Sequence, residues 1–161
     1  MSLKQNIRLL SSDEMTPFFQ EIGEKGFRAK QVYEWLWKKS AQSFDDMTNL
    51  SFKTREKLKE NFLIPAVKIK SSQISSDRTI KNAFELSDGN IVEGVLIPAP
   101  DRMTACISSQ VGCSLTCKFC ATGKLKRLRN IGFDEIFDQV VHIKNQAESN
   151  YNAPLTNIVY M

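Results

Sequence analysis

The chain of 161 residues is 42% hydrophobic and 25% charged and has 5 prolines, a composition that excludes an intrinsically disordered protein. Its formal net charge of +4 permits a nucleic-acid partner without requiring one. No apolar run reaches the roughly 18 residues that a membrane helix needs, and the polar residues 1–10 do not form a signal peptide. We therefore expect a cytoplasmic protein without a membrane partner.

The first third of the chain has a helical pattern. Ser11 or Ser12 is a candidate N-cap for a first helix, and Ser51 is a candidate N-cap for a third. Between these two helices, apolar side chains recur at helical spacing over residues 28–39 and predict a second helix. The pattern indicates a helical accessory domain at residues 1–65.

After residue 65 the period of hydrophobicity changes to two and β-branched residues accumulate, which predicts strands. Asp88, Gly89 and Asn90 have the composition of a hairpin turn between two of these strands. We predict a small antiparallel β extension at residues 66–102, followed by a further domain that starts at residue 103. The expected strands span residues 67–72, 80–86, 91–97 and 103–109.

The last part of the chain predicts a helix and then a strand. Asp134 is a candidate N-cap for a helix whose apolar stripe leaves His142 on the solvated side. Residues 156–161 form an apolar run typical of a strand buried on both faces of a parallel sheet. With the strand at 103–109 they predict one right-handed βαβ unit. Because one such unit completes neither a barrel nor a sheet, we expect a piece of a longer protein; the alternative is a complete small α+β domain.

Three of the four cysteines, Cys113, Cys117 and Cys120, have the spacing C-x3-C-x2-C in a region without periodicity. Thiolates bind soft metals, and an iron–sulfur cluster held by three of them keeps one iron open to an external ligand. Structural zinc is the alternative, because the last two cysteines have half of a zinc-knuckle spacing. Zinc needs a fourth ligand, for which Cys106 in a strand and His142 on a helix are weak candidates.

Residues 106–123, Cys-Ile-Ser-Ser-Gln-Val-Gly-Cys-Ser-Leu-Thr-Cys-Lys-Phe-Cys-Ala-Thr-Gly, carry a family resemblance. They are similar to the cluster loop of the radical S-adenosylmethionine RNA methyltransferases, and more narrowly of the bacterial dual-specificity enzymes. That group methylates carbon 2 of an adenine in large-subunit (23S) ribosomal RNA and in tRNA. Residues 27–32 and 44–50 resemble the helical N-terminal domain of the same family. The resemblance implies an α/β fold in which residues 103–161 start an incomplete radical SAM partial (β/α) barrel.

The resemblance also implies the roles of five residues. Cys113, Cys117 and Cys120 match the ligands of a [4Fe-4S] cluster whose open iron binds S-adenosyl-L-methionine, which a one-electron reductant cleaves to a radical. In the family that the sequence resembles, a further cysteine, expected beyond residue 161, carries the methyl group to the RNA. Cys106 matches the cysteine that resolves the protein–RNA adduct through a transient disulfide, and Glu93 matches the glutamate that accepts a proton from the adenine.

The sequence pattern itself supports the role of Cys106 mildly and the role of Glu93 less. Cys106 shares a strand face with Thr104 and Ser108, opposite the apolar face, where a merely packed cysteine would more often lie. Glu93 shares a face with apolar side chains, including Val95, so we expect a partly desolvated carboxylate. The resemblance outweighs the alternative, an edge-strand glutamate that reaches solvent.

Five basic residues follow or lie within the cysteine cluster without an intervening acidic residue. A solvated basic loop is the usual meaning of such a run, but beside a cluster it can hold RNA phosphates. The residues are Lys118, Lys124, Lys126, Arg127 and Arg129.

The sequence leaves two other functions open. One is the related antibiotic-resistance methyltransferase, which acts on carbon 8 of the adenine and shares the cluster loop. The other is a small zinc-binding RNA module without catalysis. For the leading hypothesis, the radical methyltransferase, we expect these 161 residues to be inactive alone.

Overall fold

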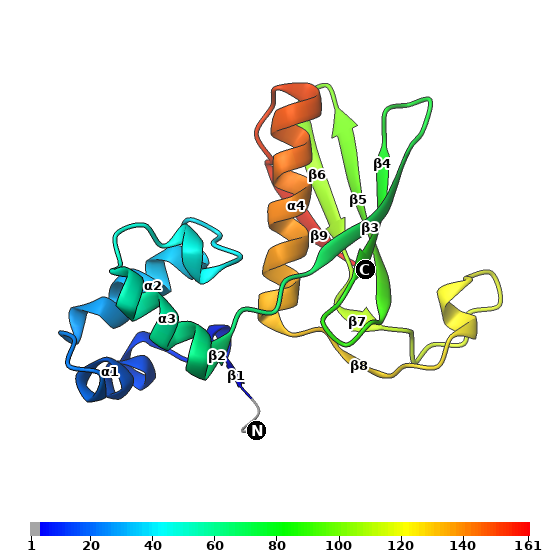
Figure 1. Cartoon of the computed structure of the whole chain (residues 1–161). Helices are drawn as coiled ribbons and strands as arrows, with labels where there is room; N and C mark the ends of the chain where they lie inside the picture. Colours follow the sequence, from blue (N-terminus) through cyan, green and yellow to red (C-terminus); the bar gives the residue numbers. More distant parts are fainter. Residues whose placement is uncertain (1–3) are drawn as a thin grey trace. The chain divides into compact units, whose positions relative to one another are not determined.

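The computed structural model describes residues 4–161 and divides the chain into two compact units, Met1–Pro65 and Ala66–Met161. Residues 1–3 of the segment considered for a signal peptide lie outside the described residues. The first unit is mainly helical, and the second is a sheet with one long helix (Figure 1). None of the helices in residues 4–161 combines the length and the apolar character that crossing a bilayer requires.

The three helices expected in the first unit are confirmed. Ser11 caps the first: its hydroxyl accepts from the Glu14 N–H at 3.3 Å, and the Glu14 carboxylate accepts from the Ser11 N–H at 2.8 Å. Ser51 caps the third by accepting from the Thr54 N–H at 3.1 Å. The elements of this unit are β1 (Gln5–Asn6), η1 (Ile7–Leu9), α1 (Ser12–Glu21), α2 (Phe27–Trp37), η2 (Phe44–Asp46), α3 (Phe52–Asn61) and β2 (Phe62–Leu63).

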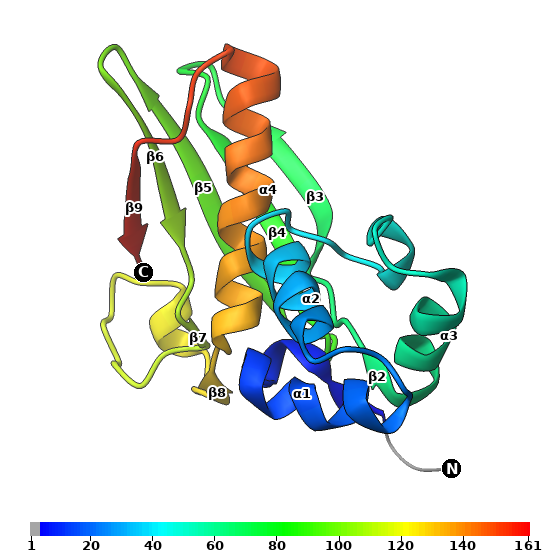
Figure 2. The same ribbon diagram turned by 90° about the vertical axis from the view of Figure 1, so that its left-hand side faces the viewer.

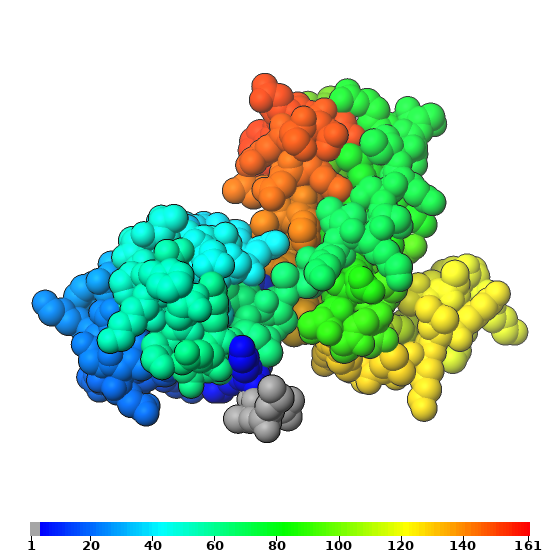
Figure 3. All heavy atoms as spheres, viewed as in Figure 1, coloured from blue at the N-terminus to red at the C-terminus, as the bar shows by residue number. Residues whose placement is uncertain are grey.

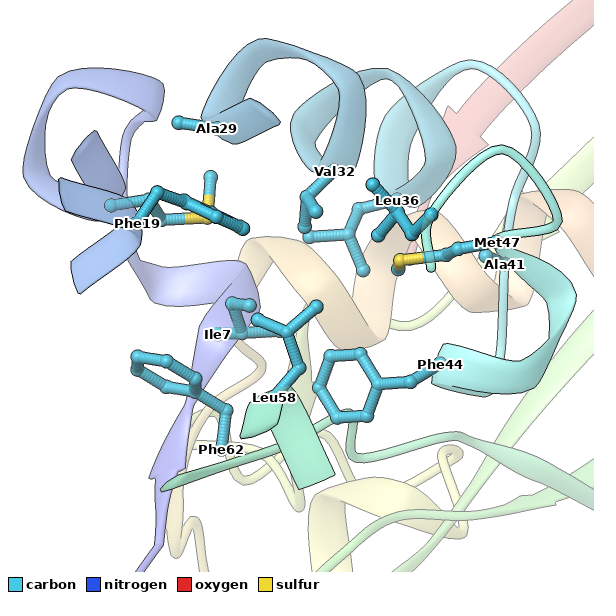
Figure 4. Packing of buried hydrophobic residues seen from close by; sticks show 12 residues of the cluster. Ile7, Phe19, Ala29, Val32, Leu36, Ala41, Phe44, Met47, Leu58 and Phe62 are labelled. Atoms are coloured by element: carbon cyan, nitrogen blue, oxygen red, sulfur yellow. The ribbon is translucent and has the colours of Figure 1, made fainter. Parts of the chain in front are cut away.

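Two short strands and a buried arginine in this unit were not predicted. β1 and β2 pair in parallel, and strands of two residues are too short to leave a periodic signal. Arg8 is buried next to the fully buried Ile7, and its guanidinium donates to the carbonyl oxygens of Ala41 and Pro65 at 3.3 and 3.4 Å. Apolar side chains from all three helices fill the core, among them Phe19, Val32, Leu36 and Leu58 (Figure 4).

The second unit is built on a five-stranded sheet in the order β3-β4-β5-β6-β9, with antiparallel pairs except for the parallel pair β6–β9. β6, α4 and β9 therefore form the predicted βαβ unit, and the sheet of the predicted β extension continues into it without a break. Helix α4 covers one face of this sheet (Figure 2). The strands and helix are β3 (Lys68–Ile74), β4 (Ile80–Glu85), β5 (Ile91–Ala99), β6 (Arg102–Ile107), α4 (Phe133–Tyr151) and β9 (Asn157–Tyr160).

Three local expectations about the second unit were wrong. The N-cap of α4 is Gly132, not Asp134, because the Glu135 carboxylate accepts from the Gly132 N–H at 3.1 Å. His142 is not solvated: its Nε2 donates to the Val67 carbonyl at 2.8 Å, and its ring is half-buried. All four residues of β9 are exposed, because α4 packs against β5 and β6 and leaves the faces of this edge strand uncovered.

Gly94 lies in β5 on the face that α4 covers. A Cβ there would lie 2.5 Å from Cε2 of Phe84 and 3.4 Å from Cδ1 of Ile143. We expect Gly94→Ala to destabilise the second unit by about 1–3 kcal/mol, the usual cost of overpacking a core. The measurement is hydrogen exchange of β4 and β5 amides, because both tryptophans lie in the other unit and their fluorescence does not report on this one. Adding Phe84→Leu should recover part of the loss; full stability of the single variant would contradict the prediction.

Candidate active site

A loop connects β6 to α4 and carries the three clustered cysteines. Its two ends pair as short antiparallel strands, β7 (Gln110–Val111) and β8 (Arg129–Asn130), and a single 3-10 turn, η3 (Thr122–Lys124), interrupts the segment between them. The predicted absence of regular periodicity is thus confirmed for most of the loop. Figure 3 shows the loop, in yellow, projecting from the body of the second unit.

The three loop cysteines are partly exposed, and none forms a disulfide. The Cys113 sulfur accepts from the Leu115 N–H at 3.4 Å, and the Cys120 N–H donates to the Cys117 carbonyl at 3.1 Å. Within residues 4–161, no three cysteine, histidine or carboxylate side chains are gathered closely enough to hold a metal ion. The donor chemistry nevertheless fits a soft metal or an iron–sulfur cluster, since three free thiols share one short loop.

Glycine permits two close approaches in this loop. Gly112 has a φ of 72°, and a Cβ on it would lie 2.2 Å from the carbonyl oxygen of Lys126. A Cβ on Gly123 would lie 3.0 Å from the carbonyl oxygen of Cys117. We call the close approach of Gly112 to Lys126 the neck of the loop. The neck and the segment with the cysteines therefore depend on positions without a side chain.

Cys106 lies on the face of the sheet opposite α4, as the alternation predicts. Its neighbours Ala105 and Ile107 are fully buried in the core, whereas Cys106 is half-buried. In the register it lies between Val95 and Val159. Burial raises the pKa of the Cys106 thiol above its ordinary value. At neutral pH this cysteine is therefore a protonated thiol.

Glu93 lies on the same face as Cys106, diagonal to it across the β5–β6 pair, at a typical Cα separation of roughly 7–8 Å. The expected desolvation of Glu93 is wrong for this chain: its side chain is 60% exposed. Its carboxylate pairs instead with the Lys81 ammonium at 3.1 Å. Sequence reasoning missed Lys81, because only the register of β4 against β5 brings it to this carboxylate.

The five basic residues of the loop do not share one role. Lys118, Lys124, Lys126 and Arg127 are exposed, and the Arg127 guanidinium also donates to the side-chain oxygens of Gln110 and Asn130 at 3.2 and 2.5 Å. Arg129 is engaged within the chain, since its guanidinium pairs with Glu135 at 2.6 Å and with Asp88 at 2.7 Å. The Arg129 guanidinium holds the pKa of Asp88 well below its ordinary value. The expectation that Arg129 holds an RNA phosphate stays a prediction, and its guanidinium is already bound by two carboxylates in the described structure.

We expect Cys106 to be alkylated several-fold more slowly than an ordinary exposed thiol at pH 8, because burial raises its pKa and lowers its thiolate fraction. The measurement is iodoacetamide labelling followed by mass spectrometry of the peptide that contains Cys106. In urea this difference should disappear. Labelling of Cys106 ahead of the three loop cysteines in the folded chain would contradict the prediction.

Comparison with known proteins finds relatives that match nearly the whole chain. Residues 5–64 match the family described as the ribosomal RNA large subunit methyltransferase N-terminal domain. The probable dual-specificity RNA methyltransferase RlmN of Cytophaga hutchinsonii is 63% identical over 158 residues, 98% of this chain and 43% of the relative. The dual-specificity RNA methyltransferase RlmN of Geotalea uraniireducens is 42% identical over 158 residues, 98% of this chain and 44% of the relative.

A solved structure agrees with these relatives. The crystal structure of a radical SAM methyltransferase from Sphaerobacter thermophilus superposes with a TM-score of 0.79 at 31% identity. The match covers 98% of this chain and 47% of that one. The chain thus spans less than half the length of the relatives it matches. Neither the carbon-8 enzyme nor the zinc module is favoured by these similarities.

Proposed function

We propose that this chain, which is similar over 98% of its length to a probable dual-specificity RNA methyltransferase RlmN and to a radical SAM methyltransferase, is part of an enzyme that methylates carbon 2 of adenine in 23S ribosomal RNA and in tRNA. Since the chain spans less than half the length of its curated relatives, we propose that it acts only within a longer polypeptide. The two alternative functions lack comparable support.

One observation carries the proposal: the loop with three free thiols directly follows the strand that presents Cys106, and Glu93 lies on the same open sheet face. Cys113, Cys117 and Cys120 would hold a [4Fe-4S] cluster. With S-adenosyl-L-methionine and one electron from a reductant, that group supplies the radical chemistry, and the protein supplies orientation. The division of the second unit into a β extension and a barrel start, at residues 66–102 and 103–161, remains part of the proposal.

The chain's own residues have separate tasks in this reaction. Glu93 takes the proton from carbon 2 of the adenine in the covalent adduct, and the Lys81 ammonium lies 3.1 Å from its carboxylate. The thiolate of Cys106 would then attack the sulfur of the methyl-carrying cysteine that the family resemblance implies. The disulfide forms as the bond between that sulfur and the transferred carbon breaks, and the electron pair of the broken bond stays on the carbon, which takes up a proton as the RNA leaves. Because burial raises the pKa of Cys106, its proton must be removed before its sulfur can attack.

RNA contacts are assigned to the exposed basic side chains of the loop. Phosphates are held by cationic side chains, and the target adenine must be unstacked for its carbon 2 to be reached. The four exposed residues are Lys118, Lys124, Lys126 and Arg127.

The test is to map the methylated atom. A polypeptide that extends this chain to the length of its relatives is incubated without oxygen with rRNA, S-adenosyl-L-methionine and a reductant, and the nucleosides are analysed by mass spectrometry against standards. We expect 2-methyladenosine. Detection of 8-methyladenosine would instead establish the carbon-8 alternative, and no methylated adenosine from a protein loaded with iron and sulfide would refute the proposal.

A further inference from the structure

The first turns of α4 contact both ends of the cluster loop. We call residues 108–111 the first arm of the loop and residues 128–131 the second arm. The arms also bond to each other: the Ile131 N–H donates to the Ser109 carbonyl and the Leu128 N–H to the Val111 carbonyl, both at 2.9 Å. The arms close the loop at its base, and what holds them determines how firmly it is closed.

Gln139 holds the first arm. Its side chain is fully buried and bonds both backbone groups of Ser108: the Ser108 N–H donates to Oε1 at 3.0 Å, and Nε2 donates to the Ser108 carbonyl at 3.1 Å. A carboxamide is suited to this position because it donates and accepts at once. The strand that carries Cys106 therefore ends at a point tied to α4.

Glu135 holds the second arm through Arg129. The carboxylate receives two hydrogen bonds from the guanidinium, at 2.6 and 2.9 Å, and its side chain is only 8% exposed. Such a bidentate pair is among the stronger polar contacts, and a buried carboxylate needs one. Asp88, in the hairpin between β4 and β5, binds the same guanidinium at 2.7 Å and so ties the second arm to the sheet as well.

Residues four apart lie on the same face of a helix, so Glu135 and Gln139 are adjacent on α4. We propose that Arg129, Glu135 and Gln139 form a loop staple, a set of positioning residues that fixes both arms of the cluster loop from one helix face. Fixing the arms lowers the conformational entropy that the segment between them loses when its three cysteines come together. The part of this proposal that concerns the three cysteines rests on the proposed function, because that function implies the cluster. The hydrogen bonds that fix the two arms do not depend on it.

The first test uses the whole 161-residue chain without iron. Gln139→Leu removes the bonds to the first arm, and Arg129→Met removes those to the second. Hydrogen exchange is followed at the amides of Leu128 and Ile131, which donate to backbone carbonyls and not to either substituted side chain. We expect exchange about tenfold faster at both amides relative to the β5 amides, because an arm that has lost buried hydrogen bonds opens locally more often. Arg129→Lys should give an intermediate rate, since an ammonium cannot form the bidentate pair.

Matched controls on the same helix separate the loop staple from general destabilisation. Gln146→Leu removes a comparable amide pair, since the Gln146 and Asn82 side chains bond each other twice at 2.8 Å. Lys144→Met removes a cation whose partner, Glu148, lies on the exposed helix surface. Both controls should leave the exchange of Leu128 and Ile131 relative to β5 unchanged. Unchanged exchange in Gln139→Leu and Arg129→Met, or an equal increase in the controls, would overturn the loop staple.

The second test measures iron and labile sulfide per chain after anaerobic reconstitution and desalting. The two staple variants should retain less than about half of the iron held by the unsubstituted chain, and the controls should retain all of it. Full retention of iron and sulfide in the staple variants, despite faster loop exchange, would show that the loop staple does not position the cysteines. If even the unsubstituted chain takes up no iron and sulfide while the variants still open the loop, the cluster assignment fails and the hold on the arms stands.

Discussion

Replacing Cys117 by serine is expected to remove nearly all iron and labile sulfide from the reconstituted chain. The unsubstituted chain should hold about four irons and four sulfides, because three thiolates suffice for a cubane cluster with one open iron. Since the described structure does not gather the three thiols, the loop has to reorganise around the cluster, and the loss of one ligand should prevent that change. Iron and sulfide analysis after anaerobic reconstitution is the measurement.

Cys106→Ser is the matched control for this loss. Cys106 is the fourth cysteine of the chain and lies in β6, on the open sheet face rather than in the loop. Its serine variant should bind as much iron as the unsubstituted chain. One zinc per chain without labile sulfide would contradict the cluster assignment and support the zinc-binding alternative.

Replacing Gly112 by alanine is expected to reduce iron binding almost as strongly, although no thiol is removed. The new Cβ would lie 2.2 Å from the Lys126 carbonyl oxygen, so the neck of the loop would have to open. The positive φ of Gly112 adds roughly 1 kcal/mol for any residue with a Cβ. The measurements are iron per chain and hydrogen exchange of the Leu128 amide, whose acceptor, Val111, precedes the substituted residue.

Gly89→Ala provides the matched control for this prediction. Gly89 also has a positive φ, 81°, but no atom lies within 4 Å of a Cβ built there. The control therefore imposes the backbone strain of an alanine without the steric overlap. It should lower stability slightly and leave iron binding unchanged. Equal iron loss in both alanine variants would show that the close approach at the neck of the loop is unimportant.

Much of the fold could be predicted because its signals are local. The caps at Ser11 and Ser51 bond to backbone groups three residues away, and the turn at Gly89 lies within one hairpin. The alternation that placed Cys106 opposite the core is likewise a property of one strand. Such features need no knowledge of distant partners, so sequence patterns are sufficient to predict them.

Most errors concern side chains whose partners lie on another element of the fold, and the N-cap of α4, which is Gly132 and not Asp134, is a local exception. His142 bonds to Val67 instead of solvent, and Glu93 pairs with Lys81 on the neighbouring strand. Arg129 looked like one of five equivalent cations, but it is bound to Asp88 and Glu135. The roles of Glu93, Cys106 and the three loop cysteines remain predictions.

The sequence by itself determined the helical first unit, the strands and the βαβ order of the second, and a loop with three thiols at a spacing suited to a cluster. Only the tertiary structure decided which polar groups hold that loop and which are left for a substrate. The physical reason is that the bonding partners are distant in the sequence: Gln139 bonds to Ser108, 31 residues away, and Arg129 bonds to Asp88, 41 residues away. Only the packing of α4 and the strand register bring these groups within hydrogen-bond distance.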